Sequence, residues 1–404
     1  MKQLRRGKGT RTKALHLLMG FALAGLVAGC GGTQGETGKS GDAVAGDVIK
    51  IGANLELSGS VASYGQSIAE GIDLAVENLN KSGGINGKKL AVIKVDNKSD
   101  AAEATNAAIK LTSQDKVAAI IGAATSGNTV AQTQVATNNK TVLLTPTGTS
   151  LNITAKADGS VNDYMFRTCF IDPFQGRVAA NFAAGELKVK SAAIFADSAS
   201  EYAKGLAASF KETFTKGGGT IVAQEAYVAK DTDFRATLTR IKSLNPDSIF
   251  IPGYYEEVGL IVKQARELGI TVPLIGADGW DSPKLLDLAG AAALNNTYIA
   301  NHYSSEDPDK MIQDFVQAFK GKYSGKSPDG FSALGYDSVY LLADGIKRAG
   351  STDGSKIKDA LAQTKDLLLV TGKITVDKQH NPIKTATVLE YKDGKQTFRT
   401  KVNP

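Results

Sequence analysis

Short apolar runs alternate with longer amphipathic segments along almost the whole chain from Val48 onward. The longer segments repeat apolar residues every three or four positions, as Ile68, Ile72 and Ala75 do, which is the period of an α-helix. This alternation is typical of α/β proteins with parallel sheets. The predicted strands are Ile49–Leu55, Leu90–Val95, Val117–Ile121, Val142–Leu144, Ala192–Phe195, Thr220–Ala223, Ser248–Ile251, Leu274–Ile275 and Tyr298–Ala300.

The number of these strands bears on domain organisation. They are more than one compact doubly wound sheet commonly holds, and the roughly 350 residues after Val48 suffice for two domains. We therefore expect an α/β fold with two Rossmann-like lobes, each built on a parallel central sheet. A cleft between two such lobes is the natural place for a ligand.

The amino terminus predicts that the protein is exported from the cytoplasm. Residues 1–13 carry six basic residues and no acid, and residues 14–27 are almost wholly apolar. Val27-Ala28-Gly29-Cys30 resembles a bacterial lipobox, in which the cysteine is acylated after cleavage. The apolar run is too short for a transmembrane helix, which needs roughly 20 residues. We expect a signal peptide over 1–29, then lipidated Cys30 and a Gly-rich flexible linker over 30–47. The lipid would anchor the chain in a periplasmic leaflet or the outer face of the plasma membrane.

The net charge of +6 comes from the amino terminus alone. Six of the 47 Lys and Arg residues precede Cys30, and the rest balance the 41 Asp and Glu residues. The expected mature chain is therefore neutral, and its charge gives no reason to expect a nucleic-acid partner. With Cys30 lipidated, Cys169 is the single remaining thiol, so no intramolecular disulfide is expected.

Motifs for catalysis or cofactor binding are missing from the sequence. There is no Walker A motif, no G-x-G-x-x-G after a strand, no H-E-x-x-H and no G-x-S-x-G. Two histidines, His302 and His380, follow Cys30, and they lie far apart in the sequence. We expect neither an enzyme nor a cofactor or metal site; His302 is interpreted as an ordinary residue at a strand end and Cys169 as a small buried one.

Several segments resemble a known family. They are IKIGANLELSGSVASYGQSIAEGIDLAVENLNKSGGINGKKL (49–90), AAIIGAATSGNTVA (118–131), VLLTPTGTS (142–150), MFRTCFIDPFQG (165–176) and IFIPGYYEEVG (249–259). In order and spacing they resemble the bacterial leucine/isoleucine/valine-binding proteins, which are substrate-binding subunits of ABC importers. The resemblance runs from about Ile49 to about Leu389.

The resemblance implies a type I periplasmic binding protein fold and a set of partners. Lobe 1 would comprise residues 48–170 and 301–372, and lobe 2 residues 171–300 and 373–404. Three crossovers would join the lobes, near 168–172, 300–303 and 371–375. The implied partners are an amino acid, the ABC permease and its ATPase subunits. A monomer is expected because the lobes must open freely.

The resemblance also assigns a site for the carboxylate of an α-amino acid. Hydroxyls and backbone amides at helix starts would hold it, because helix N-termini favour anions. The matching positions are Ser126 and Thr149, which follow predicted strands, and Thr147, whose backbone faces the ligand in the family. Ser126 and Thr149 are also ordinary helix-capping residues, and capping alone is the alternative explanation.

An ammonium group needs a charged acceptor when it enters a closed cleft. Asp278 follows the strand Leu274–Ile275 and matches the acidic ammonium ligand of the family, which is Glu in the best-known branched-chain binders. Tyr254 is assigned to the same end of the ligand. The alternative for Asp278 is a residue of a simple Asp-Gly turn.

Aromatic residues would surround the rest of the ligand. Tyr64, Tyr202 and Phe331 match aromatic positions of the family's side-chain pocket. Trp280, the only tryptophan, stands where branched-chain binders commonly have a smaller residue. It would either close the pocket against a small side chain or stack on a flat one; a tryptophan of the core or of a surface turn is the alternative.

The leading functional hypothesis is an importer's receptor for an amino acid, most plainly a branched-chain or aliphatic one. Joint presence of Ser126, Thr149 and Asp278 favours a zwitterion, because a simple carboxylate would be repelled by Asp278. One alternative is a ligand sensor that reports to a membrane signalling protein. Receptors for aromatic or polar amino acids, or for small amides, are alternatives within the importer class.

Overall fold

The computed structural model describes residues 48–403. The predicted signal peptide, Cys30 and the linker lie outside the described residues. Within 48–403, no helix is both long enough and apolar enough to cross a membrane.

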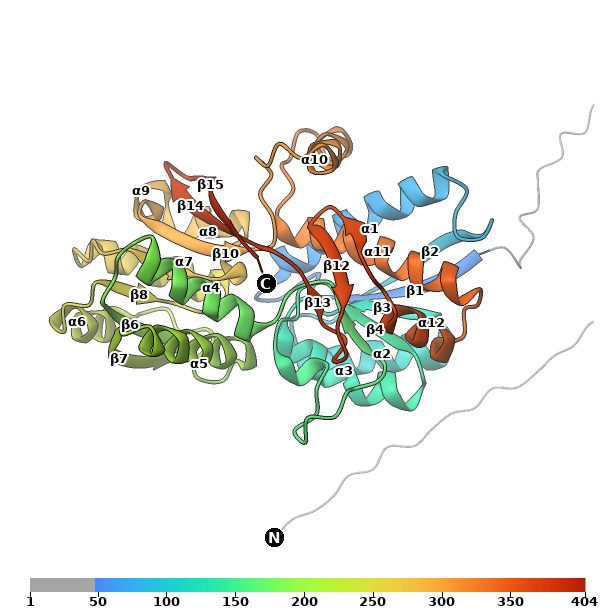
Figure 1. The fold of residues 1–404 in the computed structure, drawn as a ribbon, viewed down its shortest axis with the longest axis horizontal. Coiled ribbons are helices and arrows are strands. Elements are labelled where there is room, and N and C mark those ends of the chain that lie inside the picture. Colours follow the sequence, from blue (N-terminus) through green and yellow to red (C-terminus); the bar gives the residue numbers. More distant parts are fainter. Residues whose placement is uncertain (1–47, 404) are drawn as a thin grey trace, which may run out of the picture. The chain divides into compact units, whose positions relative to one another are not determined.

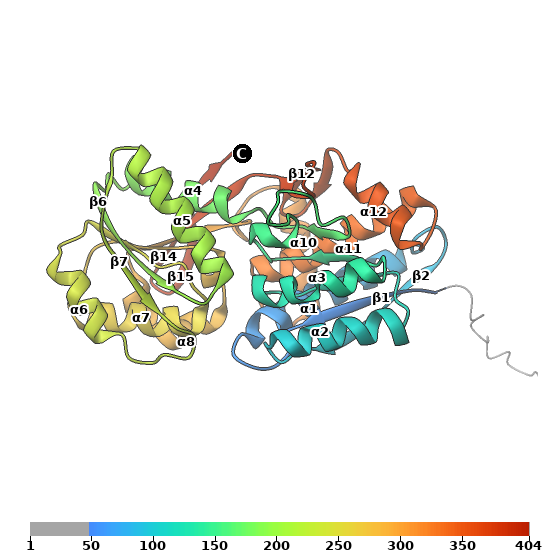
Figure 2. The same ribbon diagram turned by 90° about the horizontal axis from the view of Figure 1, so that it is seen from below.

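The first lobe is built on a five-stranded sheet in the order β2-β1-β3-β4-β5, and every strand pair in it is parallel. Its strands are β1 (Val48–Leu55), β2 (Lys89–Asp96), β3 (Ala119–Gly122), β4 (Val142–Thr145) and β5 (Met165–Arg167). Its helices are α1 (Ala62–Lys81), α2 (Ala101–Ile109), α3 (Ser126–Asn138), α11 (Gly330–Ala349) and α12 (Gly354–Ala362). Figure 1 shows α1, α11 and α12 grouped together, and Figure 2 shows α2 beside α3.

Alternate residues of the central strands separate two apolar layers. Ile121 and Leu144 pack in the layer that contains α1 and α11, whereas Ile120 and Leu143 pack in the layer that contains α2 and α3. This is the arrangement expected of a parallel sheet that is covered on both faces, because successive side chains of a strand point to opposite faces.

The second lobe is built on a seven-stranded sheet in the order β15-β14-β10-β9-β8-β6-β7. Its parallel strands are β6 (Ser191–Asp197), β7 (Thr220–Tyr227), β8 (Ser248–Phe250), β9 (Leu274–Gly276) and β10 (Thr297–Asn301). The antiparallel hairpin β14 (Ala386–Lys392) and β15 (Lys395–Val402) completes one edge. Its helices include α4 (Asp172–Gly185), α5 (Glu201–Lys216), α6 (Arg235–Ser243), α7 (Tyr255–Glu267), α8 (Pro283–Ala289) and α9 (Ala291–Leu294).

A small antiparallel sheet of β11 (Leu367–Leu369), β12 (Gly372–Val376) and β13 (Pro382–Ile383) follows α12. Residues after β12 still contact the first lobe: His380 stacks on Phe166 and bonds the Met165 carbonyl, and Asn381 bonds Thr154. The chain joins the second sheet only at β14, beyond Lys384. These contacts favour a last crossover near Lys384 over one near 371–375; the lobe boundaries themselves stay predictions.

All nine predicted strands coincide with observed ones, and the sequence missed β5 and β11 to β15. Most of the missed strands are short or half-exposed, so their apolar signal is weak. Strand β14 is the exception, with seven largely buried residues. Helix α10 (Lys310–Lys322) completes the described helices.

Candidate functional site

A small cavity lies where loops of both lobes meet. It lies at the carboxyl ends of the parallel strands, where ligand sites of α/β proteins form. Its lining comprises Tyr64, Ala124, Ser126, Thr147, Tyr202, Tyr254, Asp278, Gly279 and Phe331. Seven of these nine were predicted from the sequence; Ala124 and Gly279 were not. Within residues 48–403, the cavity included, no group of three or more His, Cys, Asp or Glu residues is arranged to hold a metal ion.

Ser126 is the first residue of α3, and its hydroxyl oxygen accepts two backbone hydrogen bonds. The amides of Thr149 and Ser150 both donate to Ser126 Oγ at 3.2 Å. Because both acceptor positions of the hydroxyl are used, its proton is left to donate. Thr149 does not line the cavity, but its buried Oγ1 has no hydrogen-bond partner among the described residues. The pair forms a donor site at a helix N-terminus, which suits an anion.

Thr147 also lines the cavity. Its Oγ1 donates to the Ala124 carbonyl at 2.7 Å, so the side chain is occupied within the protein. That the backbone of Thr147 faces the ligand stays a prediction.

Arg167 holds the loop that carries Thr149, a role that was not predicted from the sequence. Its guanidinium is fully buried and donates to the Gly148 carbonyl at 2.7 Å and to the Ser150 carbonyl at 2.8 Å. With these carbonyls bound, the amides of the same loop are turned toward Ser126. Burial lowers the pKa of Arg167, but the guanidinium remains charged because its ordinary pKa is so high.

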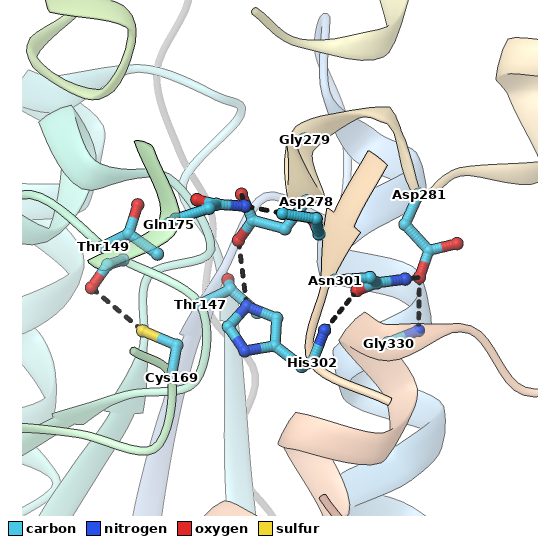
Figure 3. Close-up of polar contacts among 12 residues, drawn as sticks. Thr147, Thr149, Cys169, Gln175, Asp278, Gly279, Asp281, Asn301, His302 and Gly330 are labelled. Atoms are coloured by element: carbon cyan, nitrogen blue, oxygen red, sulfur yellow. Dashed lines mark hydrogen bonds and ion pairs between the residues drawn. The ribbon is translucent and has the colours of Figure 1, made fainter. Parts of the chain in front are cut away.

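Asp278 is buried and accepts hydrogen bonds from three side chains, of which Figure 3 shows Gln175 and His302. Gln175 Nε2 and Tyr202 Oη donate to Oδ1 at 2.9 and 2.7 Å, and His302 Nε2 lies 3.0 Å from Oδ2. Gly279 permits this packing, since a Cβ there would come within 2.6 Å of the Gly253 carbonyl and 2.9 Å of Tyr202 Oη. No Lys or Arg forms an ion pair with Asp278 within residues 48–403. The carboxylate is therefore held in place by polar neighbours while its charge lacks a full cationic partner.

His302 belongs to the site, contrary to its interpretation as an ordinary strand-end residue. Its ring stacks on Phe170 at a centroid distance of 3.7 Å. Burial lowers the pKa of His302 to about 4, against the raising effect of Asp278. At neutral pH the imidazole is uncharged, and Nε2–H donates to Asp278 without neutralising it.

The pKa of His302 predicts a pH dependence of stability. The folded pKa lies below the unfolded value, so the unfolded chain binds more protons between about pH 6.5 and 4, and stability falls as the pH falls through this window. In His302→Gln, whose amide still donates to Asp278, this contribution disappears. By pH 4.5 we expect the wild type to lose on the order of 2 kcal/mol relative to the variant. Urea unfolding of both proteins at several pH values measures this difference in the free energy of unfolding. If the free energies of the two proteins ran parallel from pH 7 to 4.5, the prediction would be wrong.

Asp172 and Gln175, at the start of α4, add unpaired acceptors near Asp278. Both carboxylate oxygens of the buried Asp172 and Oε1 of Gln175 have no hydrogen-bond partner among the described residues. The Asp172 amide bonds the Thr149 carbonyl at 3.0 Å, which places this carboxylate beside the Ser126–Thr149 pair. Burial and the charge of Asp278 raise the pKa of Asp172 well above its usual range, against the lowering effect of the neighbouring Thr149 hydroxyl. Sequence analysis missed both residues, although they lie in a quoted segment.

Four aromatic rings surround the remaining space. Tyr64 stacks on Phe331 with ring centroids 4.2 Å apart, and Tyr202 stacks on Tyr254 at 5.1 Å. Burial raises the pKa of Tyr64, Tyr202 and Tyr254, so all three keep their hydroxyl protons. The walls combine apolar ring faces with a few hydroxyls, as small-molecule sites commonly do.

Tyr64 also links the two lobes. It lies on α1, and its hydroxyl donates to the Gly279 carbonyl and accepts from the Tyr255 amide at 3.1 Å. Nearby, Tyr255 Oη donates to the Ser60 carbonyl at 3.0 Å. These bonds exist only when the lobes are close together.

Trp280 does not line the cavity, which corrects its assignment to the side-chain pocket. Its side chain is fully buried in the second lobe, and Nε1 donates to the Ile251 carbonyl at 2.9 Å. Gly276 makes room for the indole: a Cβ at this position would lie 2.2 Å from a ring atom. The core alternative therefore describes Trp280.

Comparisons with known proteins agree with this geometry. A family model described as "Periplasmic binding protein" matches residues 48–396. The chain is 32% identical over 328 residues to a Leu/Ile/Val-binding protein of Rhizobium johnstonii, covering 81% of this chain and 87% of that protein. Among solved structures, the chain is 41% identical to LivJ of Streptococcus pneumoniae, a branched-chain amino acid transporter substrate binding protein in complex with isoleucine. The TM-score is 0.83, and the match covers 88% of this chain and 100% of LivJ. The leucine binding protein LivK of Thermotoga maritima is 34% identical, with a TM-score of 0.83 and coverage of 88% and 99%.

Proposed function

Because the chain belongs to the periplasmic binding protein family, we propose that it captures a branched-chain L-amino acid outside the cytoplasm and delivers it to the permease of an ABC importer. It is a binding protein and not an enzyme, and it works outside the cytoplasm. Attachment to the membrane through a lipid on Cys30, a monomeric state and the two-lobe boundaries are further parts of the proposal.

One observation supports this function above the others: hydrogen-bond donors and acceptors are separated across the cavity. Ser126 and the first amides of α3 offer donors at one end. Asp278 offers a carboxylate acceptor at the other. A ligand with a carboxylate and an ammonium satisfies both ends, whereas a simple acid would bring a negative charge toward Asp278.

The aromatic walls favour an aliphatic side chain. Tyr64, Tyr202, Tyr254 and Phe331 leave a small space between ring faces, and Trp280 takes no part in lining it. An aliphatic group buried there gains roughly 25 cal/mol per Å² of apolar surface removed from water. The names of the similar proteins also describe the binding of leucine, isoleucine or valine.

Closure of the lobes follows from the same contacts. We assign the carboxylate to Ser126, Thr147 and Thr149 of the first lobe, and the ammonium to Asp278 and Tyr254 of the second. A ligand held from both sides stabilises the closed arrangement, because only that arrangement makes both sets of contacts. The hydrogen bonds of Tyr64 and Tyr255 across the lobes add to the closed state without touching the ligand's charged groups.

A ligand screen tests the proposal. The lipid-free chain from Gly31 onward would be unfolded and refolded to remove carried ligand, then heated with each of the twenty amino acids, urea, acetamide and benzoate. A ligand at 100 times its Kd should stabilise the protein by about 2.7 kcal/mol. We expect leucine, isoleucine and valine to raise the midpoint most. A shift with benzoate or acetamide alone would contradict the proposal.

Asp172→Asn tests whether the second carboxylate belongs to the ammonium site. The oxygens of Asp278 already accept from Gln175, Tyr202 and His302, so an ammonium with three donors gains from a second acceptor. We expect leucine binding to weaken about tenfold or more, in line with the loss of one charge-assisted hydrogen bond. Titration calorimetry measures the Kd; an unchanged Kd would remove Asp172 from the site.

A further inference from the structure

Glu56 is a buried acid beside the cavity that the proposed function does not use. It follows β1, and its side chain is fully buried. Its oxygens accept four hydrogen bonds: from the amides of Ala124 and Thr125 at 2.9 and 3.1 Å, and from Thr125 Oγ1 and Asn128 Nδ2 at 2.9 Å each. No Lys or Arg pairs with it within residues 48–403. Its negative charge is balanced by neutral donors of a single turn.

That turn carries Ser126. Ala124 and Thr125 immediately precede it, and the first bond inside α3 runs from the Thr129 amide to the Thr125 carbonyl at 3.0 Å. The amides of residues 126–128 therefore precede the first helical bond and stand at the exposed positive end of the helix. Glu56 binds the amides just before this group, which leaves those of residues 126–128 for other acceptors.

The backbone of Glu56 is itself fixed. Gly65 of α1 packs directly on it, and a Cβ on Gly65 would lie 2.2 Å from the Glu56 carbonyl oxygen and 2.8 Å from its nitrogen. The carboxylate is thus tied to β1 and α1 on one side and to the α3 turn on the other. These contacts fix the turn before α3, and with it the hydroxyl of Ser126, relative to the first sheet.

We propose that Glu56 is a positioning residue for the carboxylate end of the ligand site. It orients the Ala124–Thr125 turn, and through it Ser126 Oγ and the first amides of α3. This inference rests on the proposed function, because it assumes that Ser126 meets a ligand carboxylate. Glu56 itself touches no ligand: it does not line the cavity.

Glu56→Gln tests the proposal. Gln keeps the size of the side chain but turns one acceptor into an NH₂ group that faces donors. We expect the Kd for L-leucine to rise at least about tenfold. The Kd for L-leucinol, which has the ammonium and side chain but no carboxylate, should change little. Titration calorimetry with both ligands gives the ratio that separates a positioning role from general loosening.

Two further variants complete the test. Thr125→Val removes a single bond to Glu56 and should shift the same ratio in the same direction by a smaller amount, even if Glu56→Gln folds poorly. Asp247→Asn is a control for the loss of a carboxylate that binds backbone amides: Asp247, which is exposed, accepts those of Lys190 and Ser191 at the amino ends of strands of the second sheet. It should lower the unfolding midpoint and leave both Kd values unchanged.

Glu56→Gln binding leucine as tightly as the wild type, or weakening leucine and leucinol equally, would overturn the role of Glu56. Failure of the wild type to bind any amino acid would instead overturn the proposed function. The two failures are therefore distinguishable.

Discussion

Asp278→Asn is expected to weaken L-leucine binding by at least about 100-fold. The change keeps the shape of the side chain but removes its negative charge. Among the described residues no Lys or Arg forms an ion pair with Asp278, so this charge is available to a cationic group of the ligand. An ammonium in the closed cavity would then be buried without its counter-charge, which costs several kcal/mol. A loss of about 2.7 kcal/mol already corresponds to 100-fold in Kd.

The ligand 4-methylpentanoate gives this prediction its control, because it is leucine without the ammonium. The wild type should bind leucine far more tightly than 4-methylpentanoate. In Asp278→Asn this preference should nearly vanish, since the acid no longer meets a negative charge. Calorimetric titration of both proteins with both ligands measures the preference. If the variant still prefers leucine as strongly as the wild type does, the ammonium is bound elsewhere.

Ser126→Ala is the second change with a large expected effect. It removes the hydroxyl that donates toward the carboxylate, and it leaves the amides of Thr149 and Ser150 without their acceptor. A buried donor that loses its partner costs about 1–3 kcal/mol. We expect leucine affinity to fall about 100-fold and the unfolding midpoint without ligand to fall as well.

Ser248→Ala is the matched control for this serine. Ser248 is also fully buried, but its Oγ has no hydrogen-bond partner among the described residues, and it stands at the start of β8, away from the cavity. It should leave affinity unchanged. An unaltered Kd in Ser126→Ala would show that the Ser126 hydroxyl serves only to hold the loop of Thr149 and Ser150, whose amides it accepts.

Much of the fold was predictable because its signal is local. The runs that became β3 and β4 are buried on both faces, and covered parallel strands need such runs. Strand β5 was missed because it is three residues long and ends in Arg167, whose burial depends on the carbonyls of Gly148 and Ser150. A charged side chain such as that of Arg167 can be buried only where hydrogen-bond partners from other parts of the fold surround it. The local sequence does not reveal those partners.

The candidate site, like the fold, was predictable only in part. Asp278 and Ser126 were found through motifs and their places after strands. His302 and Gln175 were not, because their importance lies in contact with Asp278, 24 and 103 positions away in the sequence. Trp280 was misplaced because its direction depends on the absence of a side chain at Gly276. Residue type indicated which groups were capable of binding, and packing decided which of them face the cavity.

Recognition of a zwitterion is the central claim, and one set of titrations tests it most directly. The refolded, lipid-free protein would be titrated by calorimetry with L-leucine, with 4-methylpentanoate, which lacks the ammonium, and with 3-methylbutylamine, which lacks the carboxylate. We predict tight binding of leucine and, for each half-molecule, a loss of at least about 100-fold. Equal affinity for leucine and either half-molecule would contradict the account, because one end of the site would then contribute nothing.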